Sequence, residues 1–249
     1  MPFRPTAAQI EDIVDRALAE DLPDITTEAI FGADERGSAF FLAKESGVIA
    51  GLRFARAVFA TLDGSALFEE TVAEGARVEP GSVVATLHGT VRGLLTGERT
   101  ALNLLQRASG IATETRRYVD AVAGTKAKIY DTRKTMPGLR ALDKYAVTVG
   151  GGENHRYALH DMFLIKNNHI DRAGSIARAV ELARKGGRPE QVMVEVRDLG
   201  ELAEALAAGA DLILLDNLDP ATLAEAVRRT NGRVPLEASG GVTLETVRA

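Results

Sequence analysis

Cationic side chains and glycines gather in one short segment of the chain, GGGENHRYALHDMFLIKNNH, which runs from Gly150 to His169. It contains three of the four histidines of the sequence, together with Arg156 and Lys166. Guanidinium and ammonium groups bind carboxylates and phosphates, and glycines let the backbone approach a ligand closely. The segment therefore favours a pocket for an anion, although a flexible connector explains the three glycines equally well when they are considered alone.

The wider region around this segment is basic in an acidic chain. Residues 126–172 hold nine Lys and Arg against five Asp and Glu, whereas the whole chain has a net charge of −5. A local excess of cations is typical of a site for a small anionic ligand, and a solvated charged face is the alternative explanation. The acidic total argues against a nucleic-acid partner.

Composition excludes several other classes of protein. The chain has no cysteine, which excludes disulfides, thiolate metal sites and cysteine nucleophiles. It has no apolar run of membrane-spanning length, and its acidic N-terminus lacks the apolar segment of a signal peptide. We therefore expect no membrane partner and a cytoplasmic location.

More polar residues follow five short apolar runs in the second part of the chain. They include an Arg-Lys pair, a lysine, two carboxylates and a Ser-Gly-Gly turn. In chain order they are Thr132, Arg133 and Lys134, then Lys166, Glu195, Asp216, and finally Ser239, Gly240 and Gly241. If the runs are parallel strands of one sheet, their ends meet at one face.

These residues suit three chemical tasks. Four cations can clamp carboxylates, namely Arg133, His155, Arg156 and Lys166. Glu195 and Asp216 can hold sugar hydroxyls or Mg²⁺, which prefers oxygen ligands. The N–H groups of Ser239–Gly241 can bind a phosphate, and an ordinary strand-to-helix turn is the alternative there.

The elements that position these residues alternate between strand and helix after Gly124. Strands are expected at residues 127–131, 162–166, 192–196, 211–216 and 234–239, and helices at 139–151, 175–186, 199–209, 220–230 and 243–249. Apolar strands that alternate with helices predict a parallel sheet covered by those helices. Five strands are fewer than the eight of a complete β/α barrel, so we expect an incomplete one.

The first part of the chain has a different texture. Thr6 and Gln9 fit a capping box for a first helix, and strand-like runs follow at residues 38–51, 66–78 and 82–95. A long helix is expected over residues 97–123, bent or broken at Ser109-Gly110. The pattern predicts two domains, 1–105 and 106–249.

Several motifs together resemble those of the quinolinate phosphoribosyltransferases, also called nicotinate-nucleotide pyrophosphorylases (carboxylating). They are TGERTALNLLQRASGIAT, DTRKTMPGLRALDKYAVTVGGGENHR, FLIKNNHI, ILLDN and EASGG. The resemblance runs from about Ala19 to the last residue. It implies an α/β fold, with an N-terminal α/β sandwich domain and an open β/α barrel. It also implies that the last strand and helix of the barrel are missing from this sequence.

The resemblance also implies roles for individual residues. Quinolinate would be bound by Arg99, Thr132, Arg133, Lys134, His155, Arg156 and Lys166. Phosphoribosyl pyrophosphate and Mg²⁺ would be served by the catalytic group Lys134, Lys166, Glu195 and Asp216, of which Glu195 and Asp216 are the metal ligands. Ser239, Gly240 and Gly241 would bind the 5-phosphate. The family forms a homodimer with shared active sites, or a higher oligomer, in which Arg99 would reach the partner's site.

The implied reaction joins the two substrates, releases CO₂ and pyrophosphate, and yields nicotinate mononucleotide for NAD biosynthesis. Two features depart from the family pattern. Arg197 stands where a carboxylate is usual, and the family's chain continues further, through a strand with a glycine that closes over the phosphate. Two alternatives stay open: a sibling phosphoribosyltransferase that acts on another aromatic acid, and a truncated relative that binds substrates only.

Overall fold

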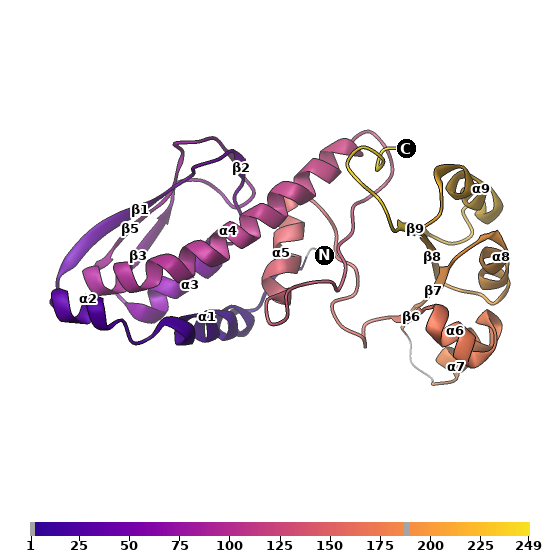
Figure 1. Ribbon diagram of the computed structural model, residues 1–249, viewed down its shortest axis with the longest axis horizontal. Coiled ribbons are helices and arrows are strands. Elements are labelled where there is room, and N and C mark those ends of the chain that lie inside the picture. Colours follow the sequence, from indigo (N-terminus) through magenta and orange to yellow (C-terminus); the bar gives the residue numbers. More distant parts are fainter. Residues whose placement is uncertain (1–2, 187–189) are drawn as a thin grey trace. The chain divides into compact units, whose positions relative to one another are not determined.

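The structure is a computed structural model that describes residues 3–186 and 190–249. The chain forms two compact units, one that ends at His155 and one that starts at Arg156 (Figure 1). The predicted domain boundary between residues 105 and 106 lies within a helix of the first unit. Each unit has its own apolar core, and each is described below by itself.

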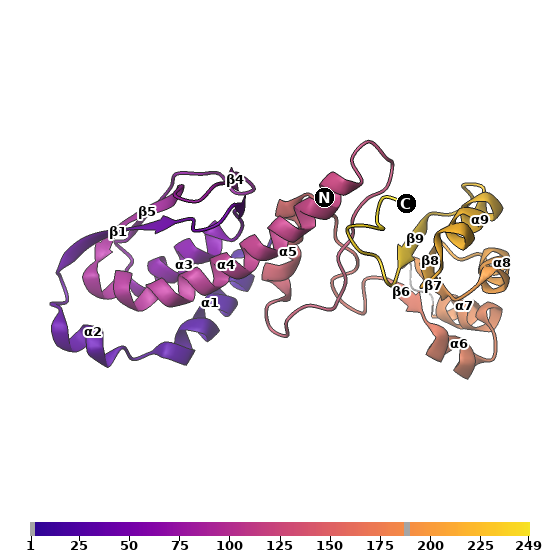
Figure 2. The same ribbon diagram turned by 45° about the horizontal axis from the view of Figure 1, so that its top comes forward.

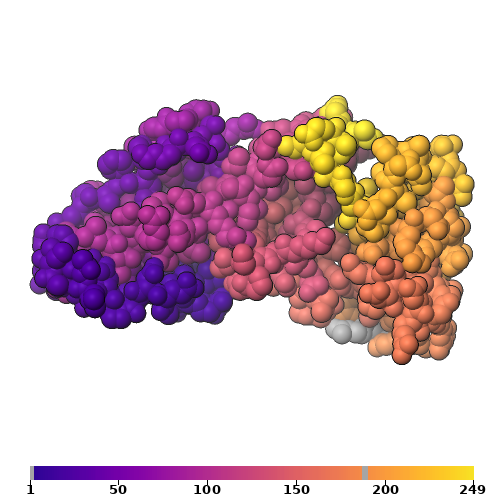
Figure 3. Space-filling view, viewed as in Figure 1, coloured from indigo at the N-terminus to yellow at the C-terminus, as the bar shows by residue number. Residues whose placement is uncertain are grey.

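The first unit begins with helix α1 (Ala7–Asp21), which starts as predicted. The Thr6 hydroxyl accepts from the Gln9 N–H, and the Gln9 side chain accepts from the Thr6 N–H. Helix α2 (Ile25–Ile30) follows, capped by Asp24. The indigo segment at the surface of the space-filling view contains both helices (Figure 3).

An antiparallel sheet and the helices packed on it build the core of the first unit. Its strand order is β1-β5-β3, from β1 (Arg36–Leu42), β5 (Val83–Thr90) and β3 (Leu67–Glu70). A second ladder pairs β2 (Gly47–Val48) with β4 (Arg77–Val78). Helices α3 (Leu52–Leu62) and α4 (Val91–Ala121) pack against each other and contact the sheet.

Helix α4 differs from its prediction at both its start and its middle. The expected strand run over residues 82–95 stops at Thr90, because the Thr90 hydroxyl accepts from the Gly93 N–H and begins the helix there. The helix then continues through Ser109-Gly110 without a break (Figure 2). Ser109 is held in place by hydrogen bonds between its hydroxyl and the backbone of Ala50.

Helix α5 (Arg140–Gly150) forms as predicted and packs on α4. The strand expected at residues 127–131 was wrong, because this segment makes only one isolated bridge, between Tyr130 and Glu153. Most of these residues are exposed, and Tyr130 keeps 42% of its surface accessible. An apolar run without a buried face gains too little from burial to form a sheet strand.

The second unit is a parallel sheet with consecutive strand order β6-β7-β8-β9. Its strands are β6 (Phe163–Ile165), β7 (Val192–Val196), β8 (Leu212–Asp216) and β9 (Leu236–Ser239). The helices described in this unit are α6 (Asn167–Ala173), α7 (Ile176–Lys185), α8 (Leu199–Ala207) and α9 (Pro220–Thr230). Alternation of strand and helix confirms the predicted α/β fold with a parallel sheet.

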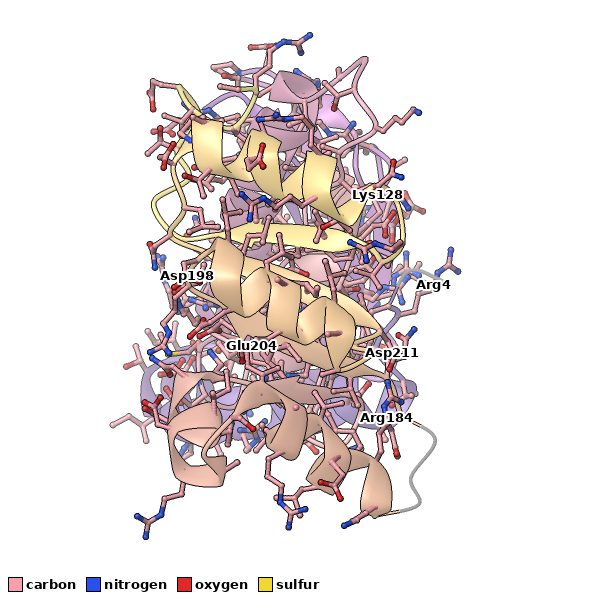
Figure 4. The ribbon with its side chains drawn as sticks, turned by 90° about the vertical axis from the view of Figure 1, so that its right-hand side faces the viewer. Arg4, Lys128, Arg184, Asp198, Glu204 and Asp211 are labelled. Carbon is pink, nitrogen blue, oxygen red and sulfur yellow. The ribbon has the colours of Figure 1, made fainter. Side chains whose placement is uncertain are left out.

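The helices cover one face of this sheet, as the side view shows (Figure 4). Val194 and Val196 of β7, with Ile213 and Leu215 of β8, are buried against them. Arg184 of α7 is labelled there beside Asp211, to whose carboxylate it donates at 3.2 Å. The helix expected at residues 243–249 was wrong, because this segment forms turns. A segment that short is too short to be a stable helix by itself.

No helix in the described ranges, 3–186 and 190–249, is long and apolar enough to cross a membrane.

Candidate functional site

In the first unit, the predicted cations Arg133 and Lys134 stand on an irregular loop that follows Asp131. The loop turns where the Thr132 hydroxyl accepts from the Lys134 N–H at 2.9 Å. Thr132 and Lys134 are exposed, whereas Arg133 is half-buried. The Nε atom of Arg133 is buried and has no hydrogen-bond partner among the described residues. The loop thus presents one exposed cation and one half-buried cation whose Nε donor has no partner among the described residues.

A buried ion pair fastens the start of this loop. Lys144 of α5 is 1% exposed, and its ammonium lies 2.6 Å from Oδ1 of Asp131, whose side chain is 6% exposed. The same ammonium donates to the carbonyl of His155 at 3.0 Å. Asp131 also accepts from the His155 N–H at 2.8 Å and from the Asn154 side chain at 2.6 Å. One carboxylate therefore binds three partners from two segments of the chain.

A second carboxylate fastens the far end of the loop. Asp143 of α5 accepts from the Met136 N–H at 3.0 Å. It also takes both arms of the Arg107 guanidinium, at 2.7 and 2.8 Å. The hydrogen bonds that Arg107 donates to the Asp143 carboxylate raise the pKa of Arg107. The loop is consequently anchored before Thr132 and after Thr135, with its cations between the anchors.

The three glycines at residues 150–152 have a packing role that the sequence alone did not reveal. A Cβ atom on Gly150 would lie 2.6 Å from the Ala112 carbonyl oxygen of α4, and one on Gly152 would lie 2.8 Å from Val147. Gly151 has a φ of 94°, which disfavours other residues. These glycines let the segment before His155 lie directly against α4, so they are not a loose connector.

The remaining residue predicted in this unit is Arg99, which is exposed on α4. His155, half-buried, follows Asn154 directly and has its backbone fixed on both sides by the ion pair described above. Within this unit the structure therefore brings the Thr132–Lys134 loop and His155 to one network. The role of Arg99 stays a prediction.

In the second unit, strand register places four of the predicted residues on one face of the sheet. Side chains alternate between the two faces of a strand, and Val194, Val196, Ile213 and Leu215 face the helices. Glu195 pairs in register with Leu214, and Asp216 pairs with Ser239. The alternation therefore places Lys166, Glu195, Asp216 and Ser239 together on the face away from the helices.

Lys166 and Glu195 make direct contact at this edge. The Lys166 ammonium lies 3.3 Å from the Glu195 carboxylate, with the two side chains 48% and 14% exposed. Lys166 comes just before α6, where its N–H donates to Nδ1 of His169 at 2.9 Å. His169 thus holds the end of β6, so its role in this unit is to position a neighbour.

The Ser239-Gly240-Gly241 turn is shaped by Asn217. The Asn217 N–H donates to the Ser239 carbonyl at 2.8 Å, and the Asn217 amide donates to the Asp216 carboxylate at 2.9 Å. A Cβ atom on Gly240 would lie 2.1 Å from Oδ1 of Asn217, whereas one on Gly241 would meet nothing within 4 Å. Both glycines have positive φ, 90° and 65°. Packing against Asn217 requires a glycine at position 240, whereas the space beside Gly241 is open.

Two arginines of this unit, Arg156 and Arg197, make hydrogen bonds to residues close in sequence. Arg156 donates to the Met162 carbonyl at 3.0 Å, across the loop before β6. Arg197, where the resemblance implied a carboxylate, donates to Glu201 of α8 through its backbone and its guanidinium. These contacts with Glu201 raise the pKa of Arg197, and they assign its side chain to the helix cap.

Magnesium fits the donors at this edge only in part. Glu195 and Asp216 supply hard oxygen ligands from adjacent strands on one face. Across residues 3–186 and 190–249, no group of three or more His, Cys, Asp or Glu side chains is arranged to hold a metal ion. Mg²⁺ is commonly held by one or two carboxylates together with substrate phosphates, so the donor set suits a metal that arrives with its substrate.

Sequence reasoning missed Asp131, Lys144, Asn154 and Glu237. Lys144 carried a signal, because a lysine in the apolar stripe of a helix is unusual unless it is paired. Glu237 pairs in register with Leu214, which places it on the same face as Glu195. Strand alternation in LEAS was the signal for that residue.

Comparison with known proteins bears on the family of the chain. Models of the N-terminal and C-terminal domains of quinolinate phosphoribosyl transferase match residues 24–109 and 111–249. A probable nicotinate-nucleotide pyrophosphorylase [carboxylating] from Synechocystis is 47% identical over 238 residues, which cover 93% of this chain and 80% of that protein. The corresponding Mycobacterium leprae protein is 47% identical over 243 residues, covering 94% and 85%.

Solved structures give the same result. NadC from Streptococcus pyogenes superposes with a TM-score of 0.94 at 41% identity, covering 98% of this chain and 88% of that one. Two family domain models and this degree of identity account for nearly the whole chain. The chain belongs to the quinolinate phosphoribosyltransferase family, a family of pentosyltransferases.

Proposed function

We propose that this protein transfers the phosphoribosyl group of phosphoribosyl pyrophosphate to quinolinate. The products are nicotinate mononucleotide, CO₂ and pyrophosphate, and the reaction serves NAD biosynthesis. Family membership supports the reaction. The observation that carries it in this chain is the Thr132–Lys134 loop, which is anchored by Asp131 on one side and by Asp143 on the other. Between these anchors, half-buried Arg133 has a buried Nε donor without a partner among the described residues.

Quinolinate carries two adjacent carboxylates, so its site needs several fixed cations. Arg133 and Arg156 are suited to this task because a guanidinium can donate two parallel hydrogen bonds to one carboxylate. His155, Arg99, Thr132 and Lys166 complete the proposed set. Fixed cations bind a dianion with little reorganisation, which favours it over a monoanion.

Phosphoribosyl pyrophosphate would use the strand ends of the second unit. Lys166 at these strand ends, and Lys134 from the loop of the first unit, would supply positive charge to the pyrophosphate, and Glu195 and Asp216 would hold Mg²⁺. When bound, Mg²⁺ neutralises charge on the phosphate oxygens. The space beside Gly241 is open, and the turn of Ser239, Gly240 and Gly241 would supply backbone N–H donors for the 5-phosphate.

The proposed chemistry needs no covalent bond to the protein. The pyridine nitrogen of quinolinate attacks the anomeric carbon of the ribose. The bond between this carbon and the pyrophosphate oxygen breaks, and its electron pair leaves with pyrophosphate. Fixed charges in the site stabilise the cationic transition state. The carboxylate beside the ring nitrogen then leaves as CO₂, and its electron pair stays on the ring next to the positive nitrogen until a proton replaces it.

A homodimer with shared active sites, or a higher oligomer, belongs to the proposal. Its support in this chain is Arg99, which is exposed on α4 and therefore accessible to a second copy. A cytoplasmic location is proposed from the lack of cysteine.

The experiment offers quinolinate and nicotinate separately to the purified protein, with phosphoribosyl pyrophosphate and Mg²⁺. We expect nicotinate mononucleotide from quinolinate, with kcat/KM at least about 100-fold above that for nicotinate, because a site built for a polar group rejects the analogue that lacks it. A preference for nicotinate would favour the sibling phosphoribosyltransferase. Binding of both substrates without product would favour the binding-only relative.

A further inference from the structure

We infer that the buried Lys144–Asp131 pair is a positioning device that sets the distance between the two cation-bearing segments of the first unit. This inference rests on the proposed function, because it concerns the residues that would bind the dicarboxylate. Lys144 is therefore a positioning residue and touches no substrate. Its ammonium lies 2.6 Å from Asp131 and 3.0 Å from the His155 carbonyl oxygen.

The pair joins two segments that are far apart in sequence. Asp131 is followed at once by Thr132–Lys134, and Asn154 is followed at once by His155. Across this junction the Asp131 N–H donates to the Glu153 carbonyl at 3.0 Å. The Asp131 carboxylate then takes the His155 N–H and the Asn154 amide. Any change in this carboxylate moves both groups of cations relative to each other.

Burial separates this pair from an ordinary surface salt bridge. The two side chains are 1% and 6% exposed, and a buried ion pair is often no more stabilising than apolar side chains of the same volume. Such a pair contributes little that apolar packing could not supply for stability alone. Its distinctive contribution is directional: four hydrogen bonds from fixed atoms define one geometry.

The Asn154 side chain extends the same device to α5 and to the start of the chain. Its amide donates to Asp131 and to the Lys144 carbonyl at 2.9 Å, and its oxygen accepts from the Phe3 N–H at 3.3 Å. The segment before His155 is thus bound to the backbone of α5 as well as to its lysine. The glycines at 150–152 permit this close approach.

The test replaces the pair by apolar residues in the double variant Lys144→Met/Asp131→Leu. If the pair had a purely structural role, the apolar replacement would preserve both the thermal midpoint and the quinolinate affinity. We expect instead that the thermal midpoint stays near that of the wild type while the quinolinate dissociation constant rises about 100-fold, the loss typical of a misplacement of about 1 Å. The wild type is measured in parallel. Unchanged affinity in the double variant would overturn the inference.

Hydrogen exchange of the His155 amide provides a readout that needs no substrate. It should accelerate at least about 10-fold in the double variant, because its acceptor is gone, while the amides of the α4 core keep their exchange rates. If the wild type fails to bind quinolinate, the proposed function fails, yet the exchange rate still decides whether the pair fixes this segment. Unchanged exchange at His155 would contradict the inference.

Two single variants complete the design. Asp131→Asn keeps the shape of the side chain but replaces one acceptor oxygen with an NH₂ donor. Both oxygens of Asp131 accept hydrogen bonds, so this NH₂ group would face another donor, and the variant should weaken quinolinate binding about 10-fold. Wild-type affinity in Asp131→Asn would also overturn the inference. Lys128→Met is the matched control, because the exposed Lys128–Glu153 pair lies near the same junction. Exposed pairs contribute little, so its affinity should not change.

Discussion

In the unit that ends at His155, the predicted site residues stand mainly on irregular loops, whereas in the unit that starts at Arg156 most of them stand at strand ends. The loops are held by buried polar side chains, Asp131 with Lys144 and Asp143 with Arg107. The strand ends are held by the backbone ladder, which fixes Glu195 and Asp216 by register.

The two kinds of scaffold should respond differently to the substitution of a side chain. A strand end keeps its geometry when a side chain is replaced, because the ladder bonds are made by the backbone. A loop anchored by a carboxylate loses its geometry when that carboxylate is lost, since an uncompensated buried charge remains. Replacement of a charged side chain at a strand end should therefore change chemistry without changing stability, whereas substitutions at anchors should change both.

The largest effect on activity should come from Lys166→Ala. Removal of this cation should lower kcat by about 10²- to 10³-fold, the usual cost of removing one group that stabilises developing charge. The thermal midpoint should change little, because the side chain is 48% exposed. Steady-state kinetics and calorimetry measure the two quantities. Lys185→Ala, which removes another exposed lysine of this unit, is the control; equal losses in both variants would refute a specific role.

Next in size is Arg133→Ala on the anchored loop. Loss of one charge-assisted contact should weaken quinolinate binding about 10- to 150-fold and leave the affinity for phosphoribosyl pyrophosphate unchanged. Isothermal titration with each substrate gives both constants. Arg117→Ala serves as the matched control, because Arg117 is exposed and its guanidinium pairs with Glu114, which lies one turn earlier on α4. Wild-type quinolinate affinity in Arg133→Ala would remove this residue from the clamp.

A pair of glycine substitutions separates packing from backbone strain at the phosphate turn. An alanine at positive φ costs about 1–2 kcal/mol, so Gly241→Ala should lower the free energy of unfolding by about that amount. Gly240→Ala should cost more, because its Cβ would lie 2.1 Å from Asn217. Denaturant unfolding of the two variants measures the difference. Equal losses would show that Asn217 moves aside freely.

The smallest effect concerns acid stability in the first unit. Hydrogen bonds from Ser65 and from the Thr90 N–H hold the pKa of Asp63 well below its usual 3.8. A depressed pKa stabilises the fold above the ordinary value and loses that contribution as the pH falls below it. The thermal midpoint of the wild type should therefore exceed that of Asp63→Asn at pH 6, and the gap should narrow by pH 3. A gap independent of pH would contradict this assignment.

Regular elements were predictable from the sequence where periodicity was strong. The capping box at Thr6 and the alternation of strand and helix after residue 160 were confirmed. The polar strand ends Lys166, Glu195, Asp216 and Ser239 followed from that alternation, because register in a parallel sheet is set by the backbone.

Irregular features were not predictable in the same way. Residues 127–131 have the composition of a strand but lack a neighbour along which to pair. The Lys144–Asp131 contact joins positions whose partnership depends on tertiary structure, so no local pattern encodes it. The role of the glycines at 150–152 was ambiguous for the same reason. Only the packing against α4 shows which atoms a side chain at these positions would clash with.

The central claim is that a dicarboxylate is decarboxylated only after it has been joined to the ribose. Quinolinate labelled in the carboxylate beside the ring nitrogen, incubated with the protein and Mg²⁺, tests it directly. We predict that labelled CO₂ is released only when phosphoribosyl pyrophosphate is added, with one CO₂ for each pyrophosphate. Release without phosphoribosyl pyrophosphate, or a nucleotide product that retains both carboxylates, would contradict the account.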